Sequence, residues 1–252
     1  MNPFYLGTSS RRVFAIHEPP LRPSPRLRSA VLCYPWGSEY VYAHRSLRLL
    51  AQRLAAAGIH TLRFDYYGTG DSDGDMSQAD LGGWEADTEA AIEGLQDMIG
   101  CAQVTLIGMR LGGAVAARVA MRLRRKVDAV VLWDPVVSGE EYIQTLERLG
   151  RPSMDGDAGK IEVLGYPLTA SMRSAIRRID LREYVATPPA RTLMLASETL
   201  ASHASLRGTA RSAGAKPFDL EPVAAPLPWV ESVTVTGAVP VRVLQRVTEW
   251  LA

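Results

Sequence analysis

Short runs of apolar residues alternate along the chain with stretches in which apolar residues recur every three or four positions. The apolar runs are SAVLCYP (29–35), HTLRFDY (60–66), QVTLIGM (103–109) and DAVVLWDP (128–135), and the helical patterns between them lie near 42–57, 77–98 and 110–123. Buried apolar strands separated by amphipathic helices are typical of βαβ units. We therefore expect an α/β fold with a mostly parallel central sheet and helices on both faces.

The alternation is interrupted in two places, which divides the chain. Residues 1–28 contain an expected edge hairpin around 12–16 and a Pro- and Arg-rich linker. Residues 139–188 lack the strand pattern and suggest two or three short helices around EEYIQTLERL and LTASMRSAIRRIDLREY. We interpret 139–188 as a small helical cap, and 29–138 with 189–252 as the core of one folding unit.

The pattern resumes after the cap and is expected to complete the sheet. RTLMLAS (191–197) is predicted to be a strand, ASLRGTARSAG (204–214) a helix, ESVTVT (231–236) a further strand and VPVRVLQRVTEWL (239–251) the last helix. Right-handed crossovers place the strand-to-helix turns of such a sheet on one edge, which is where ligands bind in open α/β sheets.

Composition narrows the classes of function only slightly. The chain has 252 residues, of which 47% are apolar, and 28 Lys and Arg nearly balance 27 Asp and Glu. This balance does not favour nucleic acid as a partner. The apolar runs are too short to span a membrane, and the N-terminus lacks an apolar signal segment, so we expect a cytoplasmic protein without a membrane partner. The oligomeric state is not predicted.

The cysteines and histidines suggest neither a cofactor nor a metal. Cys33 and Cys101 are far apart and outside any CxxC spacing, so we expect no metal site and interpret both as core residues. No cofactor-binding motif is present. The histidines are His17, His44, His60 and His203.

The most informative stretch is VTLIGMRLGGAVAARVA (104–120), where an apolar strand leads through GMRLGG directly into an Ala-rich helix. A sharp strand-to-helix turn leaves no room for side chains at its flanking positions, which explains Gly108, Gly112 and Gly113. Arg110 stands in the middle of this turn.

This turn resembles the nucleophile elbow, G-x-S-x-G, of the α/β-hydrolase superfamily. Further segments agree in order and spacing: YPWG (34–37) is similar to the family's oxyanion loop, FDYYGTGDSDG (64–74) to its D-x-R-G-x-G-x-S segment, and WDPVV (133–137) to the strand before the cap. The chain resembles serine aminopeptidase-like and exosortase-system-associated hydrolases, in an atypical subgroup with arginine at the elbow. The resemblance implies an α/β-hydrolase fold from about residue 29 onward.

The resemblance also implies a catalytic triad, which this chain lacks. Arg110 replaces the serine, and arginine is neither a nucleophile nor a base at neutral pH. The family's histidine is expected in TGAVP, where Gly237, Ala238 and Val239 stand instead. Glu198, directly after 191–197, matches the position of the third triad member. We therefore expect no Ser-His-Asp hydrolysis, and Cys33 is a poor substitute because no histidine is spaced to activate it.

The elbow instead predicts a ligand site centred on Arg110. A guanidinium at the start of a helix favours an anion or a carbonyl oxygen, and the loop after the first parallel strand could add backbone donors. The candidate ligand-binding residues are Arg110, Met109, Leu111, Trp36, Gly37, Tyr40, Asp134 and Glu198. The alternative is that Arg110 makes an internal ion pair with Asp134, Glu198 or Asp65, and that Asp134 only braces its own loop.

Three functions remain open from the sequence. The first is a pseudo-hydrolase accessory protein that binds a small acyl, peptide or other ligand bearing a carboxylate or carbonyl. The second is a non-hydrolytic enzyme, such as an isomerase, epimerase or cyclase of a natural-product or polysaccharide pathway. The third is a hydrolase with an unrecognised nucleophile. The fold does not choose among them, because function depends on the site.

Overall fold

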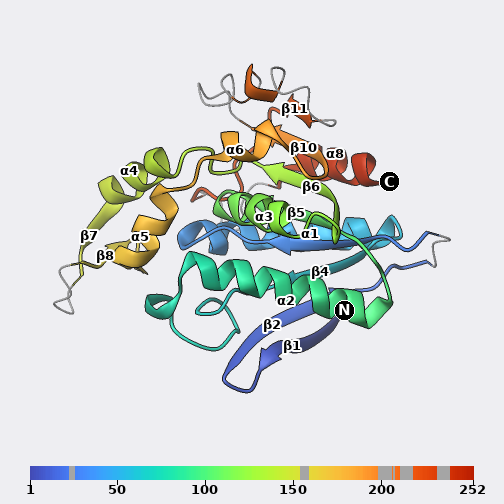
Figure 1. The fold of residues 1–252 in the computed structure, drawn as a ribbon, viewed down its shortest axis with the longest axis horizontal. Coiled ribbons are helices and arrows are strands. Elements are labelled where there is room, and N and C mark those ends of the chain that lie inside the picture. The colour runs from blue at the N-terminus through green and yellow to red at the C-terminus, as the bar shows by residue number, and fades with distance from the viewer. Residues whose placement is uncertain (23–25, 154–158, 198–205, 207, 211–217, 232–238) are drawn as a thin grey trace.

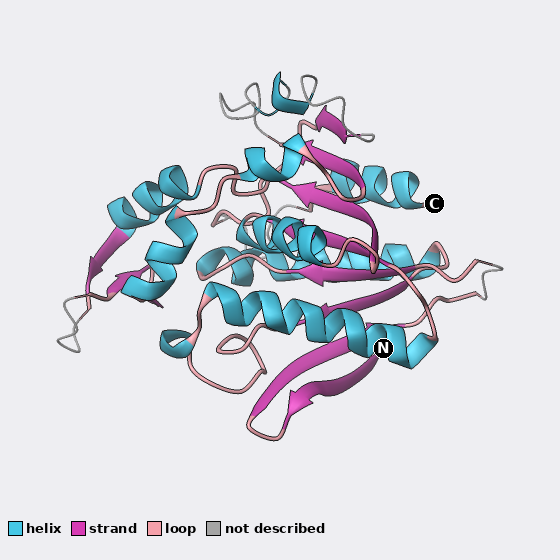
Figure 2. Ribbon diagram, viewed as in Figure 1, coloured by secondary structure: helices cyan, strands magenta, loops and turns pink. Residues whose placement is uncertain are grey.

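An eight-stranded sheet in the order β1-β2-β4-β3-β5-β6-β10-β11 runs through the centre of the computed structural model (Figures 1 and 2). The structure describes all residues except 23–25, 154–158, 198–205, 207, 211–217 and 232–238. The parallel strands are β3 (Ser29–Cys33), β4 (His60–Phe64), β5 (Val104–Met109), β6 (Val127–Trp133), β10 (Arg191–Ala196) and β11 (Phe218–Pro222). The predicted α/β-hydrolase fold with a mostly parallel sheet is confirmed.

The N-terminal hairpin extends this sheet at one edge. Strands β1 (Asn2–Thr8) and β2 (Arg11–Glu18) pair antiparallel, and β2 then pairs antiparallel with β4. The expected edge hairpin is present, but the residues named for it, 12–16, all belong to its second strand, and β1 precedes them. In β1 no residue is buried, so its sequence lacks the apolar run that marks an interior strand.

Helices cover both faces of the sheet. Helix α1 (Ser38–Ala56) packs beside α8 (Val241–Leu251), whereas α2 (Leu81–Ile99) packs beside α3 (Leu111–Arg122), which also contacts α6 (Leu181–Ala186) (Figure 2). Right-handed crossovers explain why the helices divide between the two faces of the sheet. The connection from β3 to β4 crosses the sheet in one direction, whereas the connections from β4 to β5 and from β5 to β6 cross it in the other.

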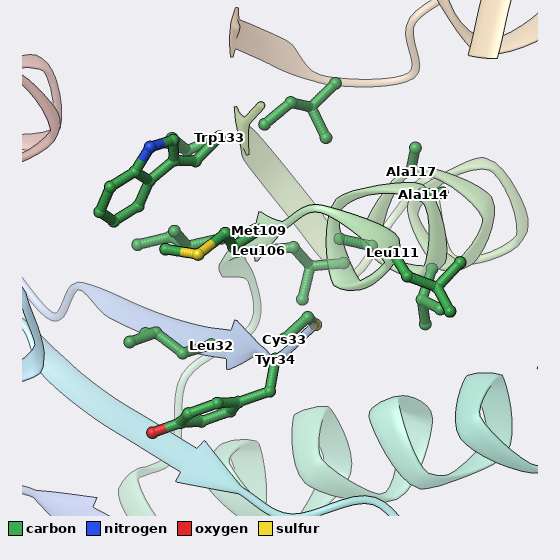
Figure 3. Packing of buried hydrophobic residues seen from close by; sticks show 14 of the residues in the cluster. Leu32, Cys33, Tyr34, Leu106, Met109, Leu111, Ala114, Ala117 and Trp133 are labelled. Atoms are coloured by element: carbon green, nitrogen blue, oxygen red, sulfur yellow. The ribbon is translucent and has the colours of Figure 1, made fainter. Parts of the chain in front are cut away.

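The central strands are buried along their whole length. All residues of β3 and β5 are buried, which is why their sequences are continuous apolar runs rather than alternating ones. Figure 3 shows Leu32 and Cys33 of β3, Leu106 and Met109 of β5 and Trp133 of β6 within one core, with Ala114 and Ala117 of α3 packed against it. The elbow at the end of β5 therefore rests on a rigid layer.

The cap segment, residues 139–188, is not purely helical. It contains α4 (Gly139–Leu149), α5 (Ala170–Arg177) and α6, as expected, but also an antiparallel three-stranded sheet of β7 (Gly150–Pro152), β8 (Ile161–Val163) and β9 (Tyr166–Leu168). Strands of three residues are too short to show an alternating pattern. Figure 1 shows α4, α5, β7 and β8 lying beyond one end of the central sheet.

Other element boundaries differ in detail from the prediction. Helix α1 starts at Ser38 rather than near residue 42. A short 3₁₀ helix, η1 (Met76–Gln78), precedes α2, which Asp80 caps by accepting a hydrogen bond from the backbone of Gly83 at 2.9 Å. Strand β11 was not predicted. The predicted strand 231–236 falls almost wholly outside the described residues, as does much of the helix expected at 204–214.

Candidate functional site

The turn between β5 and α3 is a sharp, strained elbow. Arg110 has φ 54° and ψ −122°, a conformation that side chains rarely adopt. A Cβ at Gly108 would lie 2.3 Å from the carbonyl oxygen of Gly112, and one at Gly112 would lie 2.3 Å from that of Tyr34. These contacts are the physical reason for the glycines of the elbow, as the sequence predicted.

Arg110 lies in an enclosure of one carboxylate and two aromatic rings. Its Nε donates to Glu39 Oε1 at 3.0 Å, and its Nη1 points to the backbone oxygen of Asp134 at 3.4 Å. The guanidinium carbon lies 5.5 Å from the ring centroid of Tyr142 and 5.2 Å from that of Trp229, within the range of cation–π attraction. The side chain is 20% exposed, so part of its edge remains open.

Glu39 links the elbow to the cap segment. It stands in the first turn of α1, two residues after Gly37, and its Oε2 accepts a hydrogen bond from the Tyr142 hydroxyl of α4 at 3.1 Å. Burial raises the pKa of Glu39 above its ordinary value, although Arg110 and Tyr142 act in the opposite direction. Burial also works to lower the pKa of Arg110, but the charge of Glu39 helps to keep it above its ordinary value.

Backbone donors beside the elbow are available to a ligand. Within the described part of the chain, the N–H groups of Leu111 and Gly37 donate no hydrogen bond. Leu111 begins α3 and Gly37, with φ 62°, precedes α1, so both amides belong to helix starts, whose N–H groups lack partners within the helix. These are the two places from which α/β-hydrolases take oxyanion donors, and the structure is compatible with that use.

The apolar residues among the predicted ligand-binding residues surround this elbow. Met109 and Leu111 are fully buried. Trp36 is also buried, and its ring contacts Tyr166 of β9 edge-to-face with centroids 6.4 Å apart. A Cβ on Gly37 would also meet Tyr166, at 3.7 Å. The cap segment therefore covers the loop at Trp36 and Gly37.

Asp134 braces the neighbouring strand ends. Its backbone is in the left-handed region, with φ 40°, and its Oδ1 accepts a hydrogen bond from the backbone of Ser197 at 2.7 Å. This contact ties the end of β6 to the end of β10. Asp134 approaches Arg110 through its backbone oxygen.

Among the described residues, the ion-pair partner of Arg110 is a carboxylate that the sequence did not suggest. We expected Asp134, Glu198 or Asp65, whereas the structure pairs Arg110 with Glu39. Asp65 instead accepts hydrogen bonds from the Tyr40 hydroxyl at 2.8 Å and from the backbone of Asp71 at 3.0 Å. Glu198 and Ala238 lie outside the described residues.

Tyr40 lines a different hollow from the one predicted. Together with Asp65, His44 and Arg63 it borders a cavity of about 250 Å³ between α1 and the strands β2 and β4. Arg63 is 4% exposed there and reaches Glu18 and Tyr34. The backbone N–H of Tyr40 donates to the carbonyl oxygen of Gly37 at 3.1 Å, but its hydroxyl donates to Asp65 rather than meeting Arg110.

The described histidines do not reach the elbow. His17 and His60 stack on each other with centroids 5.2 Å apart, on β2 and β4. His44 of α1 has its ring 6.0 Å from that of Tyr34, and the partial loss of hydration there lowers its pKa. His203 lies outside the described residues. None of the three described imidazoles contacts Arg110.

Cys33 is fully buried at the end of β3, and burial raises the pKa of its thiol to about 12. We therefore expect iodoacetamide to modify native protein at the partly exposed Cys101 and to reach Cys33 only after unfolding, because the thiolate is the reactive form. Mass spectrometry of tryptic peptides before and after denaturation measures this. Rapid alkylation of Cys33 in the native protein would make it a candidate nucleophile again.

The described part of the chain was predicted to hold neither a metal site nor a membrane span. Its His, Cys, Asp and Glu side chains form no group of three or more that could hold a metal ion. No helix in those ranges is long and apolar enough to cross a membrane.

Three residues of the enclosure were missed by the sequence analysis. They are Glu39, Tyr142 and Trp229. An acidic residue in the first turn of a helix is ordinarily explained by the helix dipole. The sequence therefore did not mark Glu39 as a partner of Arg110. Tyr142 lies on the buried face of α4, and Trp229 follows a Pro-rich stretch without periodicity.

The comparisons with known proteins agree on the fold. A family model described as serine aminopeptidase, S33, matches residues 42–189. Est1E of Butyrivibrio proteoclasticus, solved with ferulic acid, superposes with a TM-score of 0.71 at 16% identity, covering 98% of this chain and 96% of the other. The esterase domain of a Rhodothermus marinus protein gives 0.67 at 20% identity, covering 99% and 96%.

A peptidase is similar as well. Proline iminopeptidase of Mycobacterium smegmatis gives a TM-score of 0.64 at 11% identity, covering 99% of this chain and 97% of the other. No curated protein matches the sequence. At these identities the solved structures establish the shared fold, and the chemistry must be argued from the elbow.

Proposed function

From the premise that the chain belongs to the serine aminopeptidase (S33) family of α/β-hydrolases, we propose that it is a pseudo-hydrolase. It binds a small acyl, peptide or related ligand through a carbonyl or carboxylate oxygen at Arg110, and it does not cleave that ligand. The observation that carries this proposal is the side chain at the elbow. Arg110 adopts the strained conformation of the turn and extends its guanidinium between Tyr142 and Trp229.

The absence of hydrolysis follows from the groups around Arg110. A serine hydrolase needs a nucleophile and a base that takes its proton. The described neighbours of the guanidinium are a carboxylate, a backbone oxygen, a phenol and an indole. A guanidinium cannot attack a carbonyl carbon, because it stays protonated.

Binding is supported by the donors that remain. Glu39 occupies the Nε edge of Arg110, and no described residue accepts a hydrogen bond from Nη2. The amides of Leu111 and Gly37 are unused within the described residues. A ligand oxygen at this elbow would accept hydrogen bonds from these groups.

A second candidate is a non-hydrolytic enzyme, such as an isomerase, epimerase or cyclase. The observation that favours it is the contact of Glu39 Oε2 with the Tyr142 hydroxyl at 3.1 Å beside Arg110. A carboxyl group with a raised pKa and a buried phenol are groups that can exchange protons with a bound substrate. Such a reaction would leave the mass of the substrate unchanged.

The test measures turnover and binding together. We expect no hydrolysis of p-nitrophenyl acetate, p-nitrophenyl butyrate or an acetyl thioester, and no labelling by a fluorophosphonate. We expect N-acetylglycine or N-acetylglycinamide to bind, as followed by saturation-transfer NMR. Arg110→Ala should weaken that binding about 10- to 100-fold, the loss expected for a hydrogen bond to a charged group.

The control is Arg124→Ala, which removes an exposed arginine of the turn after α3 and should change nothing. Turnover of the esters by the wild type, failure of both probes to bind, or equal binding by Arg110→Ala would each overturn the proposal. Deuterium incorporation into a bound probe in ²H₂O that stops in Glu39→Gln would favour the second candidate.

A further inference from the structure

The cavity between α1 and the strands β2 and β4, which we call the α1 cavity, has charged side chains of both signs on its wall. Arg48 and Arg63 contribute positive charge. Asp65 and Asp71 contribute negative charge. We propose that the α1 cavity binds a small zwitterion, a molecule with an ammonium group at one end and a carboxylate at the other. This site is separate from the elbow and does not depend on the proposed function.

The two signs of charge lie at opposite ends of the α1 cavity. Arg63 and Asp65 stand two positions apart on extended chain, which places them on the same side of the sheet and roughly 7 Å apart along it. Helix α1 runs antiparallel to the parallel strands that it connects. Tyr40 therefore lies at the Asp65 end, where its hydroxyl donates to Asp65 at 2.8 Å. Arg48, two turns further along α1, lies toward the Arg63 end.

The basic end has a buried guanidinium whose donors are only partly met. Arg63 is 4% exposed, and its Nε has no hydrogen-bond partner among the described residues. Its Nη1 and Nη2 reach the Tyr34 hydroxyl and Glu18 Oε1, each at 3.4 Å. A buried arginine ordinarily donates several shorter hydrogen bonds. Arg63 is therefore placed to donate to a further acceptor, and a ligand carboxylate in the cavity would supply one.

The acidic end is held in place by close packing. Asp65 is 9% exposed and accepts hydrogen bonds from the Tyr40 hydroxyl and, at 3.0 Å, from the backbone of Asp71. A Cβ on Gly70, which has φ 52°, would overlap Asp65 Oδ2 and lie 2.7 Å from the Tyr40 hydroxyl. Burial raises the pKa of Asp65. A ligand ammonium beside this carboxylate would stabilise its ionised form.

The ring of His44 lies between the two ends. Partial loss of hydration lowers its pKa, and the charges of Arg63 and Arg48 act in the same direction. The charges of Asp65 and Asp71 oppose them, so all four charges lie close enough to influence one imidazole. Because the lowered pKa leaves His44 mostly neutral at pH 7, it cancels the charge of neither end.

The balance of charge favours a zwitterion over a simple ion. At the basic end Glu18 offsets one arginine, but Arg48 makes no ion pair with any described residue, so this end stays positive. At the acidic end two carboxylates face the cavity. A lone carboxylate would be attracted by one end and repelled by the other, and the same holds for a lone ammonium. A zwitterion is attracted by both.

The experiment compares three ligands that differ only in their charged ends. γ-Aminobutyrate carries both charges, at a spacing close to that of Arg63 and Asp65, whereas butyrate lacks the ammonium and n-butylamine lacks the carboxylate. Dissociation constants are measured by ¹H–¹⁵N chemical-shift titration. We expect the wild type to bind γ-aminobutyrate at least tenfold more tightly than either single ion. The largest shifts should fall on the backbone amides of residues 63–71.

Variants of two exposed residues test each end without disturbing the core. Arg48→Gln should weaken the binding of γ-aminobutyrate about three- to tenfold and leave that of n-butylamine unchanged. Asp71→Asn should weaken it to a similar extent and leave that of butyrate unchanged. Arg53→Gln removes an exposed arginine of α1 outside the cavity and should change nothing. Thermal unfolding of each variant confirms that it is folded.

The outcomes separate this inference from the proposed function. No binding of γ-aminobutyrate, a single ion that binds as tightly, or equal binding by Arg48→Gln would overturn the zwitterion site. Arg110→Ala should bind γ-aminobutyrate as the wild type does, and a loss there would place the ligand at the elbow and also overturn the site. Failure of the acyl probes to bind would overturn the proposed function and leave the α1 cavity unaffected.

Discussion

Gly112→Ala should destabilise the protein by about 3 kcal/mol or more, the upper end of the cost of overpacking. A Cβ at this position would lie 2.3 Å from the carbonyl oxygen of Tyr34 and 2.4 Å from that of Cys33. Both atoms belong to the backbone at the end of β3, which is buried and cannot shift without moving the sheet. Urea unfolding followed by tryptophan fluorescence measures the change in the free energy of unfolding.

Gly100→Ala is the matched control for this change. Gly100 has φ 72° at the end of α2, and a Cβ there would meet nothing within 4 Å. Its cost is therefore backbone strain alone, about 1 kcal/mol. Equal losses in the two variants would mean that the elbow is not crowded, and the explanation given for its glycines would fail.

The second large effect concerns the ion pair at the elbow. Glu39→Leu should destabilise the protein by about 3 kcal/mol, because it leaves the guanidinium of Arg110 largely buried without its carboxylate. The double variant Glu39→Leu with Arg110→Met should recover most of that loss, since apolar residues of similar volume commonly replace a buried pair at little cost. Chemical denaturation of the wild type, both single variants and the double variant measures the coupling.

The double variant separates two explanations of the pair. If the double variant is about as stable as the wild type but has lost probe binding, the pair is present for the ligand rather than for the fold. If it remains as unstable as Glu39→Leu, the pair supports the contact between α1 and the cap segment through Tyr142. That result would favour the view that Arg110 only fills the elbow.

The pairing also explains how the elbow accommodates an arginine. A serine at a nucleophile elbow is small and leaves space above it for the substrate. Arg110 fills that space with a long side chain, which requires a counter-charge and aromatic surfaces close by. Glu39 from α1, Tyr142 from α4 and Trp229 from the C-terminal part supply them, so the core and the cap segment together accommodate the arginine.

The sequence by itself determined the class of fold and the position of the elbow. Buried parallel strands require continuous apolar runs, and the crowded turn requires glycines at 108, 112 and 113. Both requirements are local, so they are visible in consecutive residues. The same segments led to the prediction that the triad serine and histidine are missing, and this stays a prediction.

Only the tertiary structure decided which residues surround Arg110. Glu39, Tyr142 and Trp229 are 71, 32 and 119 positions away along the chain, and the contacts depend on how α1, α4 and the loop at 229 pack. Carboxylates that seemed equally suitable by sequence, Asp65 and Asp134, have their side chains engaged with Tyr40 and Ser197 instead. Long-range ion pairs leave no periodic trace in a sequence, because any helix start or strand end can supply a carboxylate.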